Sequence, residues 1–576
     1  MSPLLLSDPR VTPPTTPAIV AQSAVRRLPR LALWLLSLAY ILPGFLLRDP
    51  WRGNDMAAFG YMRALAQGQT DWWAPQLLGM APETQGLLPY WLGAWAIQAL
   101  GPWLGAELAA RLPFMALLAL TLLATWHGVY GLASSRGAQP VAFAFGGEAQ
   151  PADYARAIAD GGLLALLACL GLAQPAHEVS SYLVQLCSTA VVFYALAATP
   201  TLSVLRLLAL ALGLLGLVLS GAPTLALFYS LGGTVLCWWE CRQSASDRAL
   251  ARHGAIAVLV LGGLAAVLAQ WLDLWLWKAQ WPQWEDAGSL GRLLLWFTWP
   301  TWPLALWTLW RWRKQLLAPW PHRHLLLPVW FVVVALGATV STSPADRALL
   351  LALPALAALA AFALPTLRRS VAALVDWFTL LFFSVSAIAI WVIWLSTHTG
   401  IPAKPAANVA KLAPGFVPEF SWLALLLALA ASAAWCALVG WRAKRHRAAI
   451  WKSLVLPAAG ATLSWLLLMT LWLPMLNYGR SDAPQMRAVL AALGEQHGCV
   501  QSYGLSRSQV AALQYHAGLQ LSSLSAATVS CPWLVRSQHA VWTPALASTW
   551  QEHARMARPT DKTDILVLYR RLADSP

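Results

Sequence analysis

The stretch VAALVDWFTLLFFSVSAIAIWVIWL, residues 371–395, carries a single charged side chain, Asp376. Because a helix of about 20 mostly apolar residues crosses the hydrocarbon core of a bilayer, this stretch predicts a transmembrane helix. Reading outward from it in both directions gives about twelve more runs of the same kind. These are Leu31–Leu47, Arg111–Leu132, Ile158–Leu172, Ser181–Ala198, Val204–Ser220, Pro223–Trp239, Ala255–Trp271, Leu293–Leu309, Leu325–Val340, Ala348–Leu364, Phe420–Val439 and Leu454–Leu473. The sequence therefore predicts a polytopic α-helical membrane protein with about 13 transmembrane helices.

The composition of the whole chain agrees with this fold class. Of 576 residues, 59% are hydrophobic and 11% are charged, whereas soluble domains carry roughly 25% charged residues. A net charge of +15 would favour nucleic-acid binding in a soluble protein. Here the excess lies in short loops between apolar runs, so we expect no nucleic-acid partner. The seven cysteines show no metal-ligand spacing. The sequence specifies no cofactor, and a divalent cation stays open.

The distribution of charge among the loops predicts the orientation in the membrane. With the N-terminus placed inside, the inner loops hold 20 Lys and Arg residues and the outer loops hold 8, residues 475–576 being left out. Cytoplasmic loops carry the positive excess, and the acidic residues of this chain lean the other way. We therefore expect a multi-pass protein of a bacterial inner membrane with a cytoplasmic N-terminus and a periplasmic C-terminus.

Three regions follow from this topology. Residues 1–30 form a polar cytoplasmic leader, and residues 31–474 form the transmembrane module, whose long first periplasmic loop covers residues 48–110. Part of this loop, Leu87–Leu100, is apolar but short, which favours an interfacial helix. Residues 475–576 predict a small periplasmic α/β domain. Its expected strands are 499–503, 519–524, 531–538 and 564–572, and its expected helices are 482–496 and 544–556.

Two cysteines, Cys499 and Cys531, lie in the predicted periplasmic domain. An oxidising compartment permits a disulfide between them. Two free thiols are the alternative.

The candidate chemistry lies on the outer face. No nucleotide-binding fingerprint is present, but Asp55 and Glu83 lie in the first outer loop, His177 and Glu178 lie after the third run, and Arg347 follows the ninth. Each of these residues has a plainer interpretation. Asp55 could be the N-cap of the helix that follows it, and Glu83 could be a solvated loop charge. The pair His177 and Glu178 could be a water-facing connector, and Arg347 could be an interfacial anchor.

Together, several outer-face motifs resemble those of a known family. The first loop contains W-x-x-x-D at 51–55 and DWWAPQLLG at 71–79, followed by PETQGLLPYWLGA at 82–94. Later in the chain come SGAPT at 220–224 and STSPADRALLLALPALAALAA at 341–361. With about thirteen spans and a small C-terminal domain, the chain resembles bacterial GT-C glycosyltransferases of family 39. This group includes the lipid A aminoarabinose transferases and protein O-mannosyltransferases.

The resemblance implies roles for these residues. Asp55, Glu83 and Glu178 would be catalytic, and Arg347 would bind the donor phosphate. The acceptor or sugar would contact Trp51, Tyr90 and His177. The family's lysine after the loop glutamate is absent here, with Thr84 in its place.

The implied activity is inverting transfer of a sugar from a polyprenyl-phosphate donor to a lipid A-like or other envelope acceptor at the periplasmic face. A periplasmic enzyme has no access to nucleotide sugars, which is why the donor is expected on a lipid carrier. Three alternatives stay open: a protein O-mannosyltransferase-like enzyme, an O-antigen ligase or polymerase, and a secondary transporter. Transporters need ionisable groups near the bilayer midplane, and this chain has few there.

Overall fold

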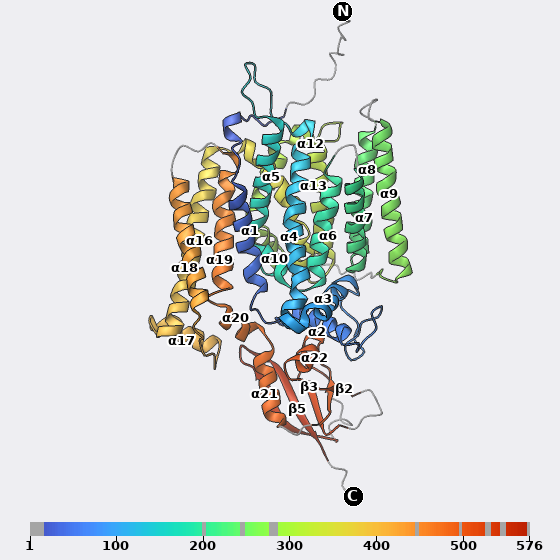
Figure 1. The fold of residues 1–576 in the computed structure, drawn as a ribbon, viewed down its shortest axis with the longest axis vertical. Helices are drawn as coiled ribbons and strands as arrows, with labels where there is room; N and C mark the ends of the chain where they lie inside the picture. Colours follow the sequence, from blue (N-terminus) through green and yellow to red (C-terminus); the bar gives the residue numbers. More distant parts are fainter. Residues whose placement is uncertain are drawn as a thin grey trace, which may run out of the picture.

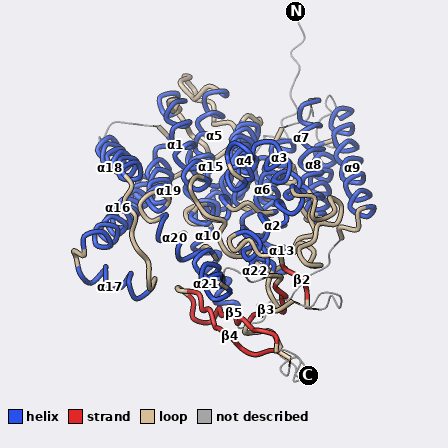
Figure 2. Tube along the Cα trace, turned by 60° about the horizontal axis from the view of Figure 1, so that its bottom comes forward, coloured by secondary structure: helices blue, strands red, loops and turns tan. Residues whose placement is uncertain are grey.

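The computed structural model describes residues 16–198, 203–241, 248–275, 286–443, 449–494, 498–524, 531–541 and 549–572. A bundle of roughly parallel helices forms the larger part, and a small sheet-containing unit lies at one end of it (Figure 1). The first described residues, 16–29, lie at the opposite end. Figure 2 shows the same separation from a second side, with the strands gathered at one edge.

The bundle contains most of the helices. They are α1 (Arg30–Phe45), α4 (Ala106–Ala133), α5 (Pro151–Ala168), α6 (Ser181–Leu196), α7 (Val204–Leu219), α8 (Pro223–Glu240), α9 (Arg248–Trp271), α10 (Ala287–Phe297), α11 (Thr301–Arg311), α12 (Arg313–Leu316), α13 (Arg323–Ser341), α14 (Ala345–Leu350), α15 (Leu353–Ala363), α16 (Arg369–Thr399), α18 (Trp422–Ala443) and α19 (Val455–Leu468). At the end that carries the sheet lie α2 (Asn54–Ala66), α3 (Leu88–Leu104), α17 (Ala403–Leu412) and α20 (Leu473–Arg480) (Figure 1).

Six helices of the described chain are long and apolar enough to cross a membrane, and a bent pair, α5 with residues 170–177, would make a seventh. Shorter apolar helices such as α1, α6 and α7 accompany them in the bundle. These helices support a membrane location. The expected number of about 13 spans stays a prediction, because length and composition alone identify fewer.

Four predicted spans are wrong as single helices. The run 293–309 is divided into α10 and α11, and the run 348–364 into α14 and α15. The runs 158–172 and 454–473 end as regular helices at Ala168 and Leu468. Proline explains the first break, since Pro300 has no N–H to donate within a helix. In the second case Pro354 lies in the first turn of α15, a position that proline favours.

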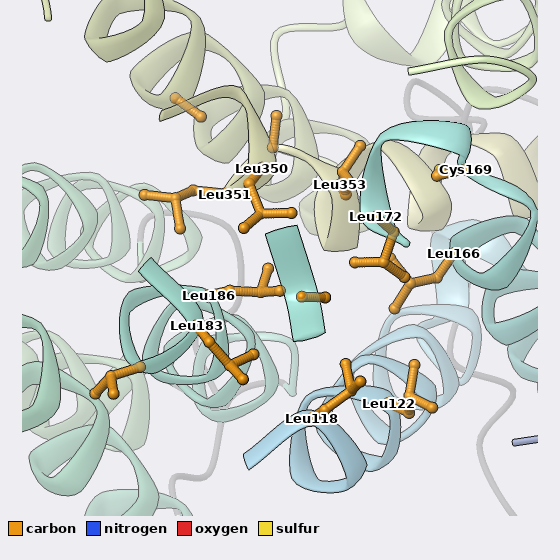
Figure 3. Packing of buried hydrophobic residues seen from close by; sticks show 14 of the residues in the cluster. Leu118, Leu122, Leu166, Cys169, Leu172, Leu183, Leu186, Leu350, Leu351 and Leu353 are labelled. Carbon is orange, nitrogen blue, oxygen red and sulfur yellow. The ribbon is translucent and has the colours of Figure 1, made fainter. Parts of the chain in front are cut away.

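The centre of the bundle is a continuous apolar core. Figure 3 shows leucines from α4, α6 and the α14–α15 segment pointing toward one another beside the end of α5. Leu118 and Leu122 come from α4, Leu183 and Leu186 from α6, and Leu350 from α14, and all are buried. This packing fixes the end of α5 next to α14, and the candidate site is built on the segments that follow these two elements.

The C-terminal unit is a five-stranded mixed sheet with two helices. The strands are β1 (Val500–Tyr503), β2 (Leu521–Ser523), β3 (Trp533–Ser537), β4 (Trp550–Arg558) and β5 (Asp561–Arg571), in the order β2-β1-β3-β5-β4. β1 pairs in parallel with β2 and β3, whereas β5 is antiparallel to β3 and β4. The helices are α21 (Ala483–Leu493) and α22 (Arg507–Tyr515). A disulfide joins Cys499 to Cys531, whose Cα atoms are 5.3 Å apart.

The expected helix at 544–556 is wrong, because residues 550–558 form β4 and pair with β5. The part of that expected helix at 544–548 lies outside the described residues. Strand pairing overrides local helix preference here, as tertiary context commonly does.

The C-terminal unit is packed directly on the first loop. α22 lies against α2 so closely that a Cβ at Gly60 would stand 2.5 Å from Cβ of Ala511. Arg63 of α2 donates to the carbonyl of Gln514 at 3.0 Å, and the backbone N–H of Gly53 donates to the Ser508 hydroxyl at 3.0 Å. The first loop and the C-terminal unit therefore form one continuous surface.

Candidate active site

Asp55 lies in the first turn of α2, buried, with both carboxylate oxygens hydrogen-bonded. Oδ2 accepts from Arg48 Nη2 and from the backbone N–H of Trp51, each at 2.9 Å. Oδ1 accepts from the backbone N–H of Val179 at 2.8 Å. The N-cap of α2 is Gly53, and Asp55 makes no capping bond. The capping interpretation is therefore wrong, and the three donors instead hold a carboxylate ion in a fixed position.

Arg48 provides the counter-ion of Asp55. Its side chain is fully buried, and Nη2 also donates to the carbonyl of His177 at 2.7 Å. The guanidinium lies 4.6 Å from the ring centroid of Trp51, a cation–π arrangement. Nε and Nη1 of Arg48 have no hydrogen-bond partner in the described part of the chain. The Arg48 guanidinium thus joins Asp55 of the first loop to His177 of the segment that follows α5.

Glu178 and Arg347 form a second buried ion pair. Arg347 Nη2, from α14, lies 2.8 Å from Oε1 and 2.7 Å from Oε2 of Glu178. Gln174 also donates to Oε1 at 3.3 Å. Glu178 directly precedes Val179, the residue whose backbone N–H donates to Asp55. The structure therefore brings Asp55, Glu178 and Arg347 together from three distant parts of the chain.

A cavity of about 260 Å³ opens beside this cluster. It is lined by Trp51, Arg52, Gln174, Glu178, Gly479, Arg480, Arg558, Thr560 and Asp561. The lining comes from the first loop, the segment after α5, α20 and the C-terminal sheet, so four regions share one cavity.

The cavity carries more positive than negative charge, with three arginines against two carboxylates. Arg480 donates to Gln174 at 2.8 Å and stands 5.2 Å from the Trp51 ring. Arg52 pairs with Asp564 at 3.1 Å, and Arg558 pairs with Asp482 at 3.5 Å. Such a lining is suited to an anionic group.

Burial changes the proton affinity of Glu178. Desolvation raises the pKa of Glu178, and the Asp55 charge raises it further, while Arg347 opposes both. The net direction is upward. A carboxyl with a raised pKa is a better proton acceptor near neutral pH than an ordinary one.

The three residues expected to contact the acceptor or sugar are all buried. His177 is 0% exposed, and its ring nitrogens lie against the carbonyls of Ala173 and Tyr40, so its contact with a sugar stays a prediction. Trp51 borders the cavity, but its ring lies between two arginines and its N–H donates to Asn477. It therefore offers little surface for stacking.

Tyr90 is also buried. The side chains of Thr84 and Ser181 beside it hydrogen-bond to each other at 2.9 Å, and burial raises the pKa of Tyr90. Glu83, next to Thr84, is exposed, and its charge acts on Tyr90 and Tyr182. The ring of Tyr182 lies 6.0 Å from the guanidinium of Arg347.

The SGAPT motif packs against the loop that bears Glu83. Gly221 has a φ of +84°, and a Cβ there would stand 2.1 Å from the carbonyl oxygen of Thr84. The N–H of Leu87 donates to the carbonyl of Leu219 at 2.7 Å. Two motifs more than a hundred residues apart therefore meet, and glycine is required at their contact.

Among the described residues, no three His, Cys, Asp or Glu side chains come together as a metal site would require.

Two solved structures share the fold of this chain. The crystal structure of ArnT from Cupriavidus metallidurans bound to undecaprenyl phosphate matches with a TM-score of 0.56 and 15% identity, covering 95% of this chain and 99% of that one. The apo structure of the same protein matches with a TM-score of 0.55 and 15% identity, covering 95% and 98%. The chain has the ArnT fold. The GT-C resemblance is thereby confirmed for the fold, which extends over almost the whole of both chains.

No family model matches the sequence, and no curated protein matches it. The ArnT fold is therefore visible from the arrangement of the helices and from a few motifs rather than from sequence identity.

Several residues that surround the candidate site were not singled out from the sequence: Arg48, Asn477, Arg480 and Arg558. Trp51 and its partner Asn477 are 426 positions apart. The available signal was weak: an amide and an arginine directly after the last apolar run.

Proposed function

We propose that this protein is an inverting glycosyltransferase that moves a sugar from a polyprenyl-phosphate donor to a lipid A-like or other envelope acceptor. The observation that carries the proposal is the convergence of Asp55, Glu178 and Arg347 beside a basic cavity. The ArnT fold supports it, since one of the matched ArnT structures is bound to undecaprenyl phosphate. The proposed location is the periplasmic face of a bacterial inner membrane.

In the proposed reaction, the phosphate of the donor is bound by Arg347 and leaves with the electron pair of the broken C1–O bond. A guanidinium suits this task because it presents a fork of donors to phosphate oxygens. The acceptor oxygen forms the new bond to C1 from the opposite side, which inverts the anomeric centre. Asp55, fixed by three donors, stabilises positive charge that develops on the sugar ring.

Glu178 takes the proton of an acceptor hydroxyl. In the structure its carboxylate is held by Arg347. A donor phosphate that binds Arg347 competes for the same guanidinium and leaves Glu178 with less opposing charge. The pKa of Glu178 then rises further, since Arg347 is the charge that lowers it. Donor binding thereby prepares the base.

The test is mass spectrometry of envelope glycolipids and glycoproteins from cells with the chain, cells without it, and cells that carry Asp55→Asn. We expect one class of glycolipid to lose a single sugar mass in the second and third strains. The same mass difference on a protein would point to the O-mannosyltransferase-like alternative. Identical envelopes in all three strains would contradict the proposal.

A further inference from the structure

A polar groove lies along the second half of α2, whereas the ion pairs lie at the start of this helix. Two adjoining cavities of about 420 and 540 Å³ share Ala64, Gln69 and Gln514 as lining residues. Their walls come from the second half of α2, the loop at 67–79, the end of α22 and residues 518–521. We call this the amide groove, because five glutamines line it: Gln67, Gln69, Gln76, Gln514 and Gln520.

The glutamine side chains of the amide groove are not used by the protein. In the described part of the chain, none of their five amide groups takes part in a hydrogen bond. Each amide offers two N–H donors and one carbonyl acceptor. The groove therefore presents a dense set of neutral donors and acceptors to a ligand.

The charged groups of the amide groove, by contrast, are already engaged. Arg63 donates to the carbonyl of Gln514 and lies 5.2 Å from the ring of Tyr515. Asp71 accepts from the backbone N–H of Trp73 at 2.8 Å. The groove is thus built for a neutral ligand that is rich in hydrogen-bonding groups, and a saccharide has this chemistry.

An aromatic cluster adjoins the amide groove. Trp72 stacks on Trp95 with centroids 6.1 Å apart, and Trp73 meets Trp91 edge-on at 5.3 Å. Trp73 is 62% exposed and Trp95 is 49% exposed. Exposed tryptophans at one end of an apolar bundle are typical of the membrane–water interface. A ligand of the groove can therefore keep a lipid tail in the bilayer.

We propose that the amide groove binds the neutral saccharide part of the glycolipid acceptor. The inference rests on the proposed transferase function and specifies its acceptor. Asp55 and Gln67 stand at opposite ends of α2, roughly 18 Å apart along the helix axis. The groove therefore holds sugars at a distance from the reacting group and selects the acceptor without taking part in the chemistry.

The experiment measures binding of a panel of neutral di- to tetrasaccharides, chitobiose among them, to the full chain in lipid nanodiscs. The test variant is Gln69→Ala with Gln514→Ala. The matched control is Gln538→Ala, an exposed glutamine of the same unit outside the groove. Since one neutral hydrogen bond contributes a factor of roughly 3 to 10, we expect the double variant to weaken saccharide binding at least tenfold and the control to change nothing.

In acceptor-transfer assays the double variant should raise the KM for acceptor with kcat unchanged. Asp55→Asn should retain saccharide binding. Saccharide binding to the amide groove is therefore tested separately from the catalytic role of Asp55. Absence of binding by the whole panel overturns the proposal. Equal binding by the double variant and the wild type does the same, as does displacement of bound saccharide by neutral peptides at lower concentration.

Discussion

The carboxylates of the two acid–arginine pairs differ in how many hydrogen bonds the protein gives them. Asp55 receives three hydrogen bonds and its partner Arg48 is fully enclosed. Glu178 is bound mainly by Arg347, borders the cavity, and has a raised pKa. The enclosed pair is a fixed element of the structure, whereas the pair at the cavity has partners that a ligand can replace.

This difference assigns separate tasks to two similar carboxylates. A fully bonded carboxylate has few lone pairs left for a ligand, and its position is fixed by its donors. A carboxylate whose counter-ion can be drawn away changes its proton affinity when the ligand arrives. The comparison predicts that damage to the first pair affects stability as well as rate, and that damage to the second affects ligand binding and pH dependence.

The largest effect is expected from Arg48→Ala. It leaves the Asp55 charge buried without its partner, and breaking a buried pair from one side costs about 3–5 kcal/mol. Thermal unfolding in detergent should show the loss. The double variant Arg48→Met with Asp55→Leu should recover most of the stability, because no buried charge is left, yet remain inactive. Normal stability of Arg48→Ala would remove the distinction between the two pairs.

Asp55→Asn is expected to lower transfer by roughly 10² or more, since the fixed charge is lost while the side-chain shape is kept. The amide also meets three donors with one oxygen, so some stability should be lost. Gly53 is the N-cap, and the helix itself should persist. Radiolabelled transfer with the folded fraction matched by circular dichroism measures the effect. Near-normal transfer would leave Glu178 as the main acid.

The general architecture could be predicted from the sequence because apolar runs record it directly. The ArnT fold, the helix at 88–104, and four of the five strands at the C-terminus correspond to expectations drawn from local pattern. The prediction failed where distant contacts decide the outcome. β4 is a strand because β5 lies beside it, and the run at 293–309 is broken where Pro300 interrupts it.

The structure brings together Asp55, Glu178 and Arg347, which the motif resemblance had singled out, and their catalytic roles stay predictions. Their supporting residues were not predicted. Arg48 was indistinguishable in sequence from any interfacial arginine, since only its burial against Asp55 defines its role. The enclosure of His177 is likewise invisible in the sequence, because a histidine beside a glutamate looks the same whether it is exposed or buried.

Glu178→Gln is expected to lower transfer by about 10² and to change its pH dependence. The wild-type rate should fall as the pH drops through the raised pKa of Glu178, and this acid limb should disappear in the variant. Stability provides a second readout. The pKa of Glu178 in the folded protein lies above the usual value of 4.5. The contribution of Glu178 to the free energy of unfolding therefore falls as the pH rises from 4.5 through the raised pKa. An unchanged acid limb would contradict the role of base.

The smallest effect is expected from substitutions of Arg347, which is proposed to bind both Glu178 and the donor phosphate. Arg347→Ala should weaken donor binding about tenfold or more, because a hydrogen bond to a charged group contributes roughly 1.5–3 kcal/mol. Arg347→Lys should retain part of the affinity as a point charge without the fork. Turnover at saturating donor should change less than affinity. Titration with a polyprenyl phosphate in nanodiscs gives the dissociation constants directly.

The comparison between the pairs adds a sharper expectation. If donor phosphate and Glu178 compete for the same guanidinium, Glu178→Gln should bind polyprenyl phosphate more tightly than the wild type, by a few-fold, because a neutral amide holds Arg347 less strongly than a carboxylate does. Asp55→Asn should show no such gain, since Asp55 is paired with Arg48 instead. Equal donor affinity in all three proteins would mean that Arg347 is bound to Glu178 for structural reasons alone, and the donor phosphate would then have to be sought at Arg480.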